Sequence, residues 1–531
     1  MSREYSTTRQ HHGATGMKDK RVLAYAGNAV GGTAMLNAMI MHFGSSQLGS
    51  SWDLEGWTFE EIKRLIEEDM QEGKSGTDCA IIWNTILIKP DILPLHRIFA
   101  NISHLFPQTN YSGWAMEGVF TPLVSVHDGQ RVSSYNSCLE PLVSNGALDL
   151  AFETKINRLI FQKNGTSLKV SALELSHRGV TRILHLKSTA KVVLSAGSIE
   201  SPAILLRSGV GPRSVLDIAS LPQVKELPVG VGFQDMPMIG VVGWTKLYKT
   251  MTSLGVIGLW DVLQYFTHKT GAFAHASALS NIILLRTSIQ RRKGAQSFPN
   301  IECVMMAAGA AEQTIFKDAS NMIDAQWEAF SKPHAGSSFI ITCFLLNPLS
   351  KGRITIEPEN LSAQIDPNYF SDPADIAAMV EGVSWLHHIF NQHYRYVPEY
   401  ADHAFEFNQT ALQEVRRLQT EGQVELNLPQ FLGCPTLPTA EAALEEWRGF
   451  YECMVRTQTF TGYHYWSSLR MTNYSDHLHG VTNPDMRVKG VDNLWVGDAS
   501  VAPVMPDGHP MGMLLAIAKK LAFILAQFGI N

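Results

Sequence analysis

Residues 462–471 read GYHYWSSLRM, and residues 487–520 read RVKGVDNLWVGDASVAPVMPDGHPMGMLLAIAKK. In these two stretches, His464 and His509 bracket a short apolar run that ends in Gly497-Asp498. Pro510 suits the first position of a helix, because its φ angle is already helical and its missing N–H has no helical partner there. The pattern predicts a short buried strand, a turn and an apolar helix, with both histidines at one site.

The composition is that of a folded protein with a large core. The chain has 531 residues, of which 45% are hydrophobic and 17% charged, and its net charge is −6. This length indicates two domains, which could be interleaved. The acidic balance without a basic run makes nucleic acid an unexpected partner. No apolar run reaches the roughly 18 residues of a membrane span, so no membrane partner is expected.

The cysteines and the glycosylation sequons are the residues that indicate in which cellular compartment the protein matures. The six cysteines are scattered without a C-x-x-C pair, so no metal site is expected, and their spacing does not assign a disulfide. Asn-x-Ser/Thr sequons begin at Asn101, Asn110, Asn164, Asn360, Asn408 and Asn473. They favour a secretory route, and unused sequons in a cytoplasmic protein are the alternative. Residues 1–20 are polar throughout, so we expect a disordered tail and no signal peptide.

A glycine-rich segment lies near the start of the chain. Residues 27–38 read GNAVGGTAMLNA, with Gly31 and Gly32 before a run of small residues. Glycine lets a backbone approach a ligand closely, and a following helix can direct its N-terminal N–H groups at that ligand. The alternative is a tight loop with nothing bound.

A second ligand-binding corner is expected after a strand-rich region at 148–194. Asn164-Gly165 marks a hairpin turn. Residues 192–194 read VVL, as a buried strand does, and Ala196-Gly197 follows. Ser201 could cap a helix that has Pro202 in its first position. A strand, a turn of small residues and a capped helix form such a corner in an α/β sheet.

Taken in order, these motifs resemble the glucose–methanol–choline (GMC) oxidoreductase family of flavoproteins. GNAVGGTAMLNAM resembles the family's glycine-rich flavin segment, and LSAGSIESPAILLRSGVGP resembles its second signature. NPLSKGRITI and IDPNYFSDPAD resemble the start of its C-terminal region. The resemblance implies an α/β FAD-binding domain assembled from separate pieces of chain, and an α+β substrate domain with a sheet flanked by helices.

The resemblance also implies roles for individual residues. His464 matches the family's catalytic base, and His509 matches the second catalytic position, which hydrogen-bonds the substrate oxygen. Unperturbed imidazole titrates near neutral pH, which suits a base. The helix that starts at Pro510 would face the pyrimidine edge of the flavin and favour its reduced, negatively charged state. The cofactor-binding residues implied in this way are Gly31, Gly32, Asn37, Ile156, Asp498, Ala499, Pro510 and Met511.

The sequence departs from the family pattern at three places. The family opens with a strand–turn–helix that carries G-x-G-x-x-G, and we expect the chain to lack this N-terminal dinucleotide-binding βαβ unit. Either the sequence comes from an incomplete gene model that lost its first exons, or the protein truly lacks the unit. Ser467-Ser468 stand where the family usually has Gly-Thr, and Met236 stands where histidine is usual.

These expectations divide the chain and assign it a reaction. Residues 1–20 form the tail, 21–240 are mostly FAD-binding domain, 241–465 are mainly substrate domain, and 466–531 return to the FAD-binding domain. The leading hypothesis is FAD-dependent oxidation of a small or medium organic alcohol, with oxygen or another electron acceptor reoxidising the flavin. The alternatives are a cyclase or dehydratase on the same scaffold, and a relative without catalytic activity.

Overall fold

A seven-stranded antiparallel sheet forms one half of the molecule. The computed structural model describes residues 2–45, 52–68, 84–85, 93–107, 117–248, 250, 259–271, 274, 279–294, 297–309, 314–331, 337–476 and 478–528. Within them the strand order is β20-β14-β17-β16-β15-β5, and β21 also pairs with β14. The strands are β5 Gly118–Phe120, β14 Pro237–Thr245, β15 Leu279–Leu285, β16 Ile301–Met306, β17 Ser337–Leu345, β20 Val424–Leu426 and β21 Phe460–Thr461.

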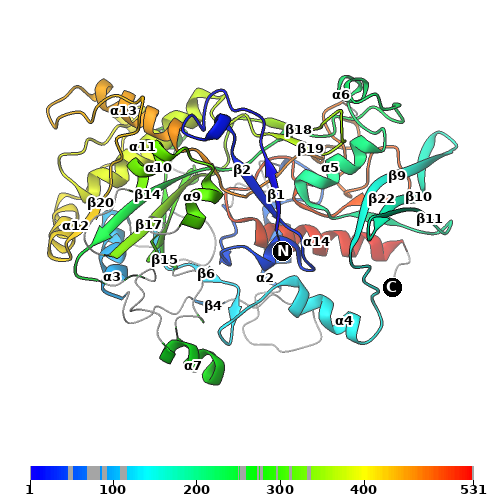
Figure 1. The fold of residues 1–531 in the computed structure, drawn as a ribbon, viewed down its shortest axis with the longest axis horizontal. Helices are drawn as coiled ribbons and strands as arrows, with labels where there is room; N and C mark the ends of the chain where they lie inside the picture. Colours follow the sequence, from blue (N-terminus) through cyan, green and yellow to red (C-terminus); the bar gives the residue numbers. More distant parts are fainter. Residues whose placement is uncertain are drawn as a thin grey trace.

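Helices cover one face of this sheet, on the left of Figure 1. The longest, α11, is apolar nearly all round and buried along most of its length, and Asp372 caps its start by accepting from the Ala374 backbone N–H at 2.9 Å. The helices of this region are α3 Leu93–Asn101, α8 Ser288–Arg291, α9 Thr314–Ser320, α10 Asp324–Ser331, α11 Pro373–Phe390, α12 Gln409–Glu421 and α13 Leu444–Thr457. Helix α7, Leu259–His268, projects from the lower edge in Figure 1.

The other half, on the right of Figure 1, is built around a short parallel strand pair and the C-terminal helix. Strand β12, Val192–Leu194, pairs in parallel with β22, Leu494–Val496. The remaining elements here are β9 Thr154–Asn164, β10 Ser167–His177, β11 Val180–His185, α5 Gly197–Arg207, α6 Arg213–Ile218, β13 Val231–Phe233, β18 Gly352–Ile356, β19 Ala363–Asp366, η7 Ala499–Val501 and α14 Pro510–Gln527. The predicted hairpin at Asn164-Gly165 is confirmed, because Asn164 pairs with Ser167.

Short elements from the first third of the chain join the halves. They are β2 Leu23–Gly27, η2 Gly32–Met35, β3 Ile40–Met41, α2 Phe59–Glu67, β4 Asn84–Thr85, η3 Ile102–Leu105, β6 Leu123–Val124, β7 Val126–His127, β8 Gln130–Arg131, the π-helical turn Tyr135–Leu139 and α4 Glu140–Ser144. One apolar core runs from α14, β12 and β22 to the face of the large sheet that α11 does not cover. The large sheet therefore has helices on one face and the second half of the molecule on the other.

The expected disordered tail at 1–20 is wrong, because residues 2–20 are ordered. Strand β1, Ser2–Ser6, pairs with β2 along its whole length. The charged end is held by an ion pair of 3.0 Å between Arg3 Nη1 and Glu200 Oε1. Further on, Ala14 and Met17 are 0% and 3% exposed. This segment is ordered although it has few large apolar residues, because partners from distant parts of the chain form hydrogen bonds and ion pairs with its polar groups.

Helix α14 is long and apolar enough, by length and composition alone, to cross a membrane. Its inward face, which includes Met513, Ile517 and Leu521, is buried in the core. Lys520 on its outer side donates to Glu61 Oε1 of α2 at 2.9 Å. About a third of the helix is buried inside the protein, and these contacts join it to the core and to α2.

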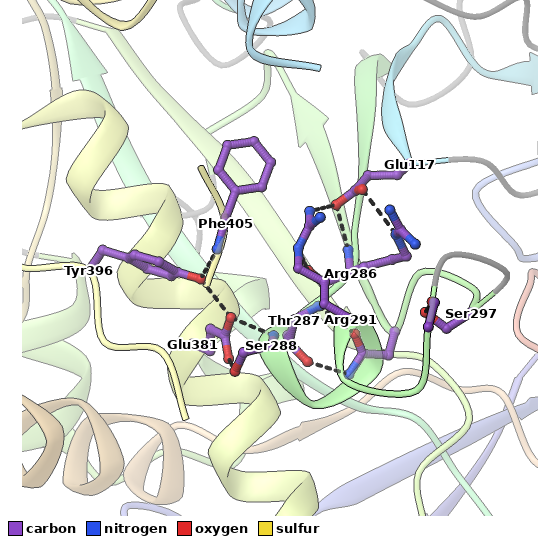
Figure 2. A network of polar contacts seen from close by, with 11 residues as sticks. Glu117, Arg286, Thr287, Ser288, Arg291, Ser297, Glu381, Tyr396 and Phe405 are labelled. Carbon is purple, nitrogen blue, oxygen red and sulfur yellow. Dashed lines mark hydrogen bonds and ion pairs between the residues drawn. The ribbon is translucent and has the colours of Figure 1, made fainter. Parts of the chain in front are cut away.

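A network of polar contacts holds the large sheet at its edge strand β5 (Figure 2). Glu117, at the start of β5, accepts from Arg286 Nε at 3.0 Å and also pairs with Arg291. Glu381 of α11 is 0% exposed and accepts from the Ser288 backbone N–H at 2.7 Å. The hydroxyl of Tyr396 donates to the same carboxylate at 2.6 Å. The network ties edge strand β5, helix α8 and helix α11 together, so the sheet is a rigid support.

A disulfide joins the two central strands. Cys303 of β16 and Cys343 of β17 are directly opposite each other and bonded, on the face that packs against the helices. The neighbouring pair, Glu302 and Phe344, points to the other face because side chains alternate along a strand. A second disulfide, Cys434–Cys453, lies away from these strands.

Removing the first disulfide by the double substitution Cys303→Ala/Cys343→Ala is expected to destabilise the protein by about 4 kcal/mol. The closed loop, with a sequence separation of 40, restricts the unfolded chain somewhat more than the loop of Cys434–Cys453, with a separation of 19. The second pair is worth about 3 kcal/mol in the same entropic account. Denaturant unfolding of both double variants measures the two losses, and a first variant as stable as the parent contradicts the expectation.

Candidate active site

The two histidines that the sequence singled out lie against each other. His464 follows β21, and His509 is the residue immediately before α14. Their ring centroids are 4.8 Å apart and their planes are inclined at 74°. Phe344 of β17 lies beside both rings, with centroid distances of 5.8 Å to His464 and 6.0 Å to His509. The structure therefore brings the predicted catalytic pair together, and Pro510 opens α14 as predicted.

The backbone around His464 is held by a buried carboxylate, Asp235. One oxygen accepts from the His464 backbone N–H at 3.1 Å, and the other accepts from Thr461 Oγ1 at 2.6 Å and from the hydroxyl of Tyr369. Burial raises the pKa of Asp235 to about 6. Tyr463, next to His464, has a φ of +60°, in the left-handed region where such strain often marks a functional site.

The ring of His464 is oriented by Met236. Its Nδ1 lies 3.0 Å from the Met236 sulfur. A thioether sulfur carries no hydrogen to donate and is a weak acceptor, so this contact assigns the proton to Nδ1 and leaves Nε2 free to accept. Burial, and then the neighbouring His509, lower the pKa of His464 well below its ordinary value. As a whole residue, His464 is half-buried. It is thus a neutral imidazole with an unprotonated Nε2.

Glu302 is a site residue that the sequence did not reveal. It is 1% exposed on its side chain, and its Oε1 lies 3.0 Å from His509 Nε2. Its Oε2 lies 3.5 Å from Nδ1 of His42, which is also buried. Burial alone would raise the pKa of Glu302, but His509 and His42 reverse this and hold it well below its ordinary range. A lone acid inside the apolar run IECVMM was the available signal.

In the part of the chain that the structure describes, no group of three or more histidine, cysteine, aspartate or glutamate side chains is arranged to hold a metal ion.

The predicted glycine-rich segment is a tight turn without the expected helix. Gly31 and Gly32 have φ angles of +95° and +61°, as a tight turn requires, but the chain continues only into the four-residue 3₁₀ turn η2, which starts at Gly32. Such a short turn has no appreciable dipole to offer an anion. Asn37 does not extend into open space, because its Oδ1 accepts from Arg131 Nη1 at 2.7 Å. These residues shape the backbone of the segment.

Asp498 is engaged within the protein. One oxygen accepts from the Gly197 backbone N–H at 2.9 Å and from Ser201 Oγ at 2.5 Å, and the other accepts from the Ser500 backbone N–H at 3.0 Å. It therefore fastens the first turn of α5 to η7, which begins at Ala499. Of the other predicted residues, Ile156 is half-buried on β9, and Met511 is buried in the first turn of α14.

The predicted start of α5 at Ser201-Pro202 is wrong. The helix begins at Gly197, so Pro202 lies inside it. Proline lacks the N–H that would bond the carbonyl of Ser198, four residues earlier. The hydroxyl of Ser468 donates to that carbonyl at 2.7 Å and replaces the lost bond. This contact explains one of the two serines at the departure from the family pattern.

The residues present fit the FAD that the resemblance implies. The positions where a Cβ would stand on Gly32 and Gly197 have no atom within 4 Å, so both turns border open space. The hydroxyl oxygen of Ser467 is buried without a hydrogen-bond partner among the described residues. The Ser467 backbone N–H donates to the Ala499 carbonyl at 3.3 Å, which sets this hydroxyl beside η7. A buried hydroxyl beside η7, with no partner in the described structure, suits a polar ligand.

Comparisons with known proteins agree with the geometry. The N-terminal model of the GMC oxidoreductase family matches residues 8–238, and its C-terminal model matches residues 348–518. The chain is 23% identical to the alcohol dehydrogenase [acceptor] of Pseudomonas putida, over 98% of this chain and 85% of that protein. It is also 23% identical to the chloroplastic fatty acid photodecarboxylase of Chlamydomonas reinhardtii, over 94% and 78%.

Among solved structures, a fungal aryl-alcohol oxidase superposes with a TM-score of 0.75 at 19% identity, covering 100% of this chain and 90% of that one. This likeness shows the fold. The predicted absence of the family's N-terminal unit is not borne out, because the N-terminal family model matches residues 8–238. Both family models match in order along the chain, around one histidine pair. The chain belongs to the GMC oxidoreductase family, whose cofactor is FAD.

Proposed function

We propose that the protein oxidises the CH–OH group of an organic alcohol to a carbonyl in an FAD-dependent reaction. The observation that carries this proposal is the contact between His464, a neutral base, and His509, which a buried carboxylate orients. Relatives at 23% identity have names that denote different reactions, so the reaction is argued from the site. The comparisons give no support to the cyclase or dehydratase alternative.

Proton removal is the work of the two histidines. An alcohol hydroxyl that binds against the rings meets Nε2 of His464, the atom left unprotonated by the contact with Met236. His509 donates from Nε2 to Glu302, which leaves its Nδ1 unprotonated as a second acceptor beside the substrate hydroxyl. The hydroxyl proton passes to His464 and can be shared with this second ring.

The cofactor supplies the other half of the oxidation. FAD, when bound, provides the acceptor for the hydride that leaves the carbinol carbon. Gly31, Gly32, Gly197, Ser467 and the first turn of α14 are the residues that would hold it. Asp498 acts indirectly, by fixing α5 to η7. Oxygen or another electron acceptor completes the cycle.

The wall beside the histidines favours an alcohol with an apolar body. Glu302 shares its sheet face with Val304 and Met306 on β16, since side chains alternate along the strand. Its cross-strand neighbour is Phe344, whose own neighbour on β14 is Met238. Glu302 is occupied by histidines and is not available to a sugar. Aromatic and aliphatic alcohols are therefore proposed ahead of polyols.

The mass of the product tests the reaction. The holoenzyme is incubated with benzylic, long-chain and sugar alcohols, and the products are analysed by mass spectrometry. Loss of two hydrogens from a benzylic or long-chain alcohol supports the proposal. Loss of water, or an unchanged mass with every alcohol, contradicts it.

Met236→Leu is expected to lower kcat about fivefold with little change in KM. Leucine preserves the apolar volume but removes the sulfur that receives the His464 Nδ1 proton, so the ring populates the wrong tautomer. A weak hydrogen bond of about 1 kcal/mol corresponds to a rate factor of this size. Steady-state kinetics measure the effect, and Met305→Leu, a buried methionine on the helix-covered face of β16, is the control. An unchanged kcat in Met236→Leu contradicts the assigned tautomer.

We also propose that the protein matures in a secretory compartment. Of the sequon asparagines in the described ranges, Asn164, Asn360, Asn408 and Asn473 are exposed. Disulfides join Cys303 to Cys343 and Cys434 to Cys453, as is usual in oxidising compartments. Protein secreted from a eukaryotic host is expected to lose mass on treatment with a glycosidase that removes N-linked glycans. No loss of mass contradicts the proposal.

A further inference from the structure

A third histidine lies behind the catalytic pair. His42 follows strand β3 and is 0% exposed. Its Nδ1 lies 3.5 Å from Glu302 Oε2, while His509 Nε2 lies 3.0 Å from Glu302 Oε1. The two imidazoles therefore share one buried carboxylate, one on each oxygen. The family resemblance assigned no role to residue 42.

The buried carboxylate of Glu302 needs a positive charge close to it. An ionised carboxylate inside a protein is costly unless a cation compensates it. Glu302 is 1% exposed, and in the described structure only histidine rings lie in ion-pair contact with it. A second proton on His42 or on His509 would supply the compensating charge.

The two possible protonation states differ in what His509 can do. If His509 holds the second proton, both of its nitrogens are donors and it cannot accept a proton from the substrate. If His42 holds it, His509 stays neutral, with Nε2–H directed to Glu302 and Nδ1 free as an acceptor. The position of one proton thus decides whether His509 can share the hydroxyl proton with His464.

We propose that His42 is a positioning residue that holds the proton compensating Glu302 and so keeps His509 neutral during the reaction. This inference rests on the proposed alcohol oxidation and deepens it. The resting cluster is then His42 imidazolium, Glu302 carboxylate, neutral His509 and neutral His464. The hydroxyl proton enters this cluster at His464 or His509 and leaves to solvent, so no further co-reactant is required.

The surroundings of His42 support this assignment. Among the residues that the structure describes, Glu302 from β16 and His509 at the start of α14 face it, and His464 lies beyond them. Asp507, in the turn before α14, binds the backbone N–H of Ser45 at 2.9 Å and so fixes the segment that carries His42. A Cβ on Gly508 would lie 2.8 Å from the His42 carbonyl oxygen, so the two segments are in close contact.

The pH profile of kcat/KM for alcohol oxidation tests the proposal. In His42→Phe the compensating proton must move to His509, so the acid limb is expected to shift upward by about 1–3 pH units, the usual effect of a neighbouring charge. His42→Gln preserves a hydrogen-bond donor but cannot carry a proton, and the same shift is expected. If His42 were merely structural, His42→Gln would keep the wild-type profile, and that result would overturn the proposal. His42→Gln also decides the question if His42→Phe does not fold.

Two further variants make the test specific. In the background of Glu302→Gln there is no charge to compensate, so adding His42→Gln is expected to cause no further shift. His387→Gln replaces another fully buried histidine, on α11, whose pKa burial lowers to about 4, and the profile is expected to be unchanged. An equal shift in both backgrounds, or in His387→Gln, overturns the proposal. A wild-type enzyme that oxidises no alcohol refutes the proposed function instead, while an active wild type with unshifted His42 variants refutes only this inference.

Discussion

His464→Ala is expected to lower kcat for alcohol oxidation by about 10²–10⁴-fold, the usual contribution of a general base. The substitution removes the acceptor of the hydroxyl proton but none of the backbone that the proposed cofactor site uses. FAD content should therefore remain that of the wild type. Steady-state kinetics normalised to bound flavin measure the loss. Added imidazole should restore part of the rate, because it can enter the space that the side chain leaves.

The assignment of His464 as the base also predicts how kcat/KM depends on pH. The pKa of His464 is lowered by burial and by His509, so the base stays unprotonated below its ordinary value of 6.5. Protonation of His464 therefore limits kcat/KM only well below pH 6.5. In the unfolded chain the histidine binds a proton near pH 6.5, so its contribution to stability is present above that pH and is lost as the pH falls. A wild-type-like kcat in His464→Ala contradicts the role of this residue.

Glu302→Gln is expected to lower kcat by about 10–150-fold. A hydrogen bond to an ionised group contributes about 1.5–3 kcal/mol, and each 1.36 kcal/mol corresponds to a factor of ten in rate. Glutamine can also present its amide N–H to His509, which favours the wrong tautomer. The measurement is kcat with a saturating alcohol. KM should change little, because Glu302 contacts His509 and not the substrate.

Glu381→Gln is the matched control for Glu302→Gln. Glu381 is also a fully buried glutamate with several donors, but it belongs to the network that ties α8 to α11 (Figure 2). Its replacement should lower the melting temperature and leave kcat unchanged. Equal losses of kcat in the two variants would mean that Glu302 acts only through stability.

The parts of the site that lie in continuous motifs could be predicted from the sequence. His464, His509 and the proline-initiated helix α14 are of this kind, because neighbouring residues define their local structure. Glu302 and His42 could not be predicted, because each lies in a short apolar segment that reads as core. Their roles arise only when β16 packs beside the start of α14, some two hundred residues away in the chain.

The errors in the predicted secondary structure have the same origin. Ser201-Pro202 has the pattern of a helix start, yet α5 begins earlier because Asp498 and Ser468 supply the bonds that the first turns need. The polar residues 2–20 have the composition of a tail, yet β1 is ordered by pairing with β2. In both cases partners distant in sequence override the local preference.

Ser467 illustrates how structure explains a departure from a family pattern. Its φ is +67°, a conformation that glycine adopts without strain, so the usual glycine at this position has a physical reason. Serine keeps the conformation and adds a buried hydroxyl beside η7. The proposed cofactor site therefore differs locally from that of relatives that carry glycine there.

The rate of anaerobic flavin reduction in a single turnover tests the central claim most directly, because it observes the first half of the reaction without an acceptor. The wild-type holoenzyme and His464→Ala are each mixed with an apolar alcohol that carries either hydrogen or deuterium on the carbinol carbon. The account predicts bleaching of the flavin that is slower with deuterium, and much slower in His464→Ala. A flavin that stays oxidised, or that bleaches equally fast in both proteins, would contradict it.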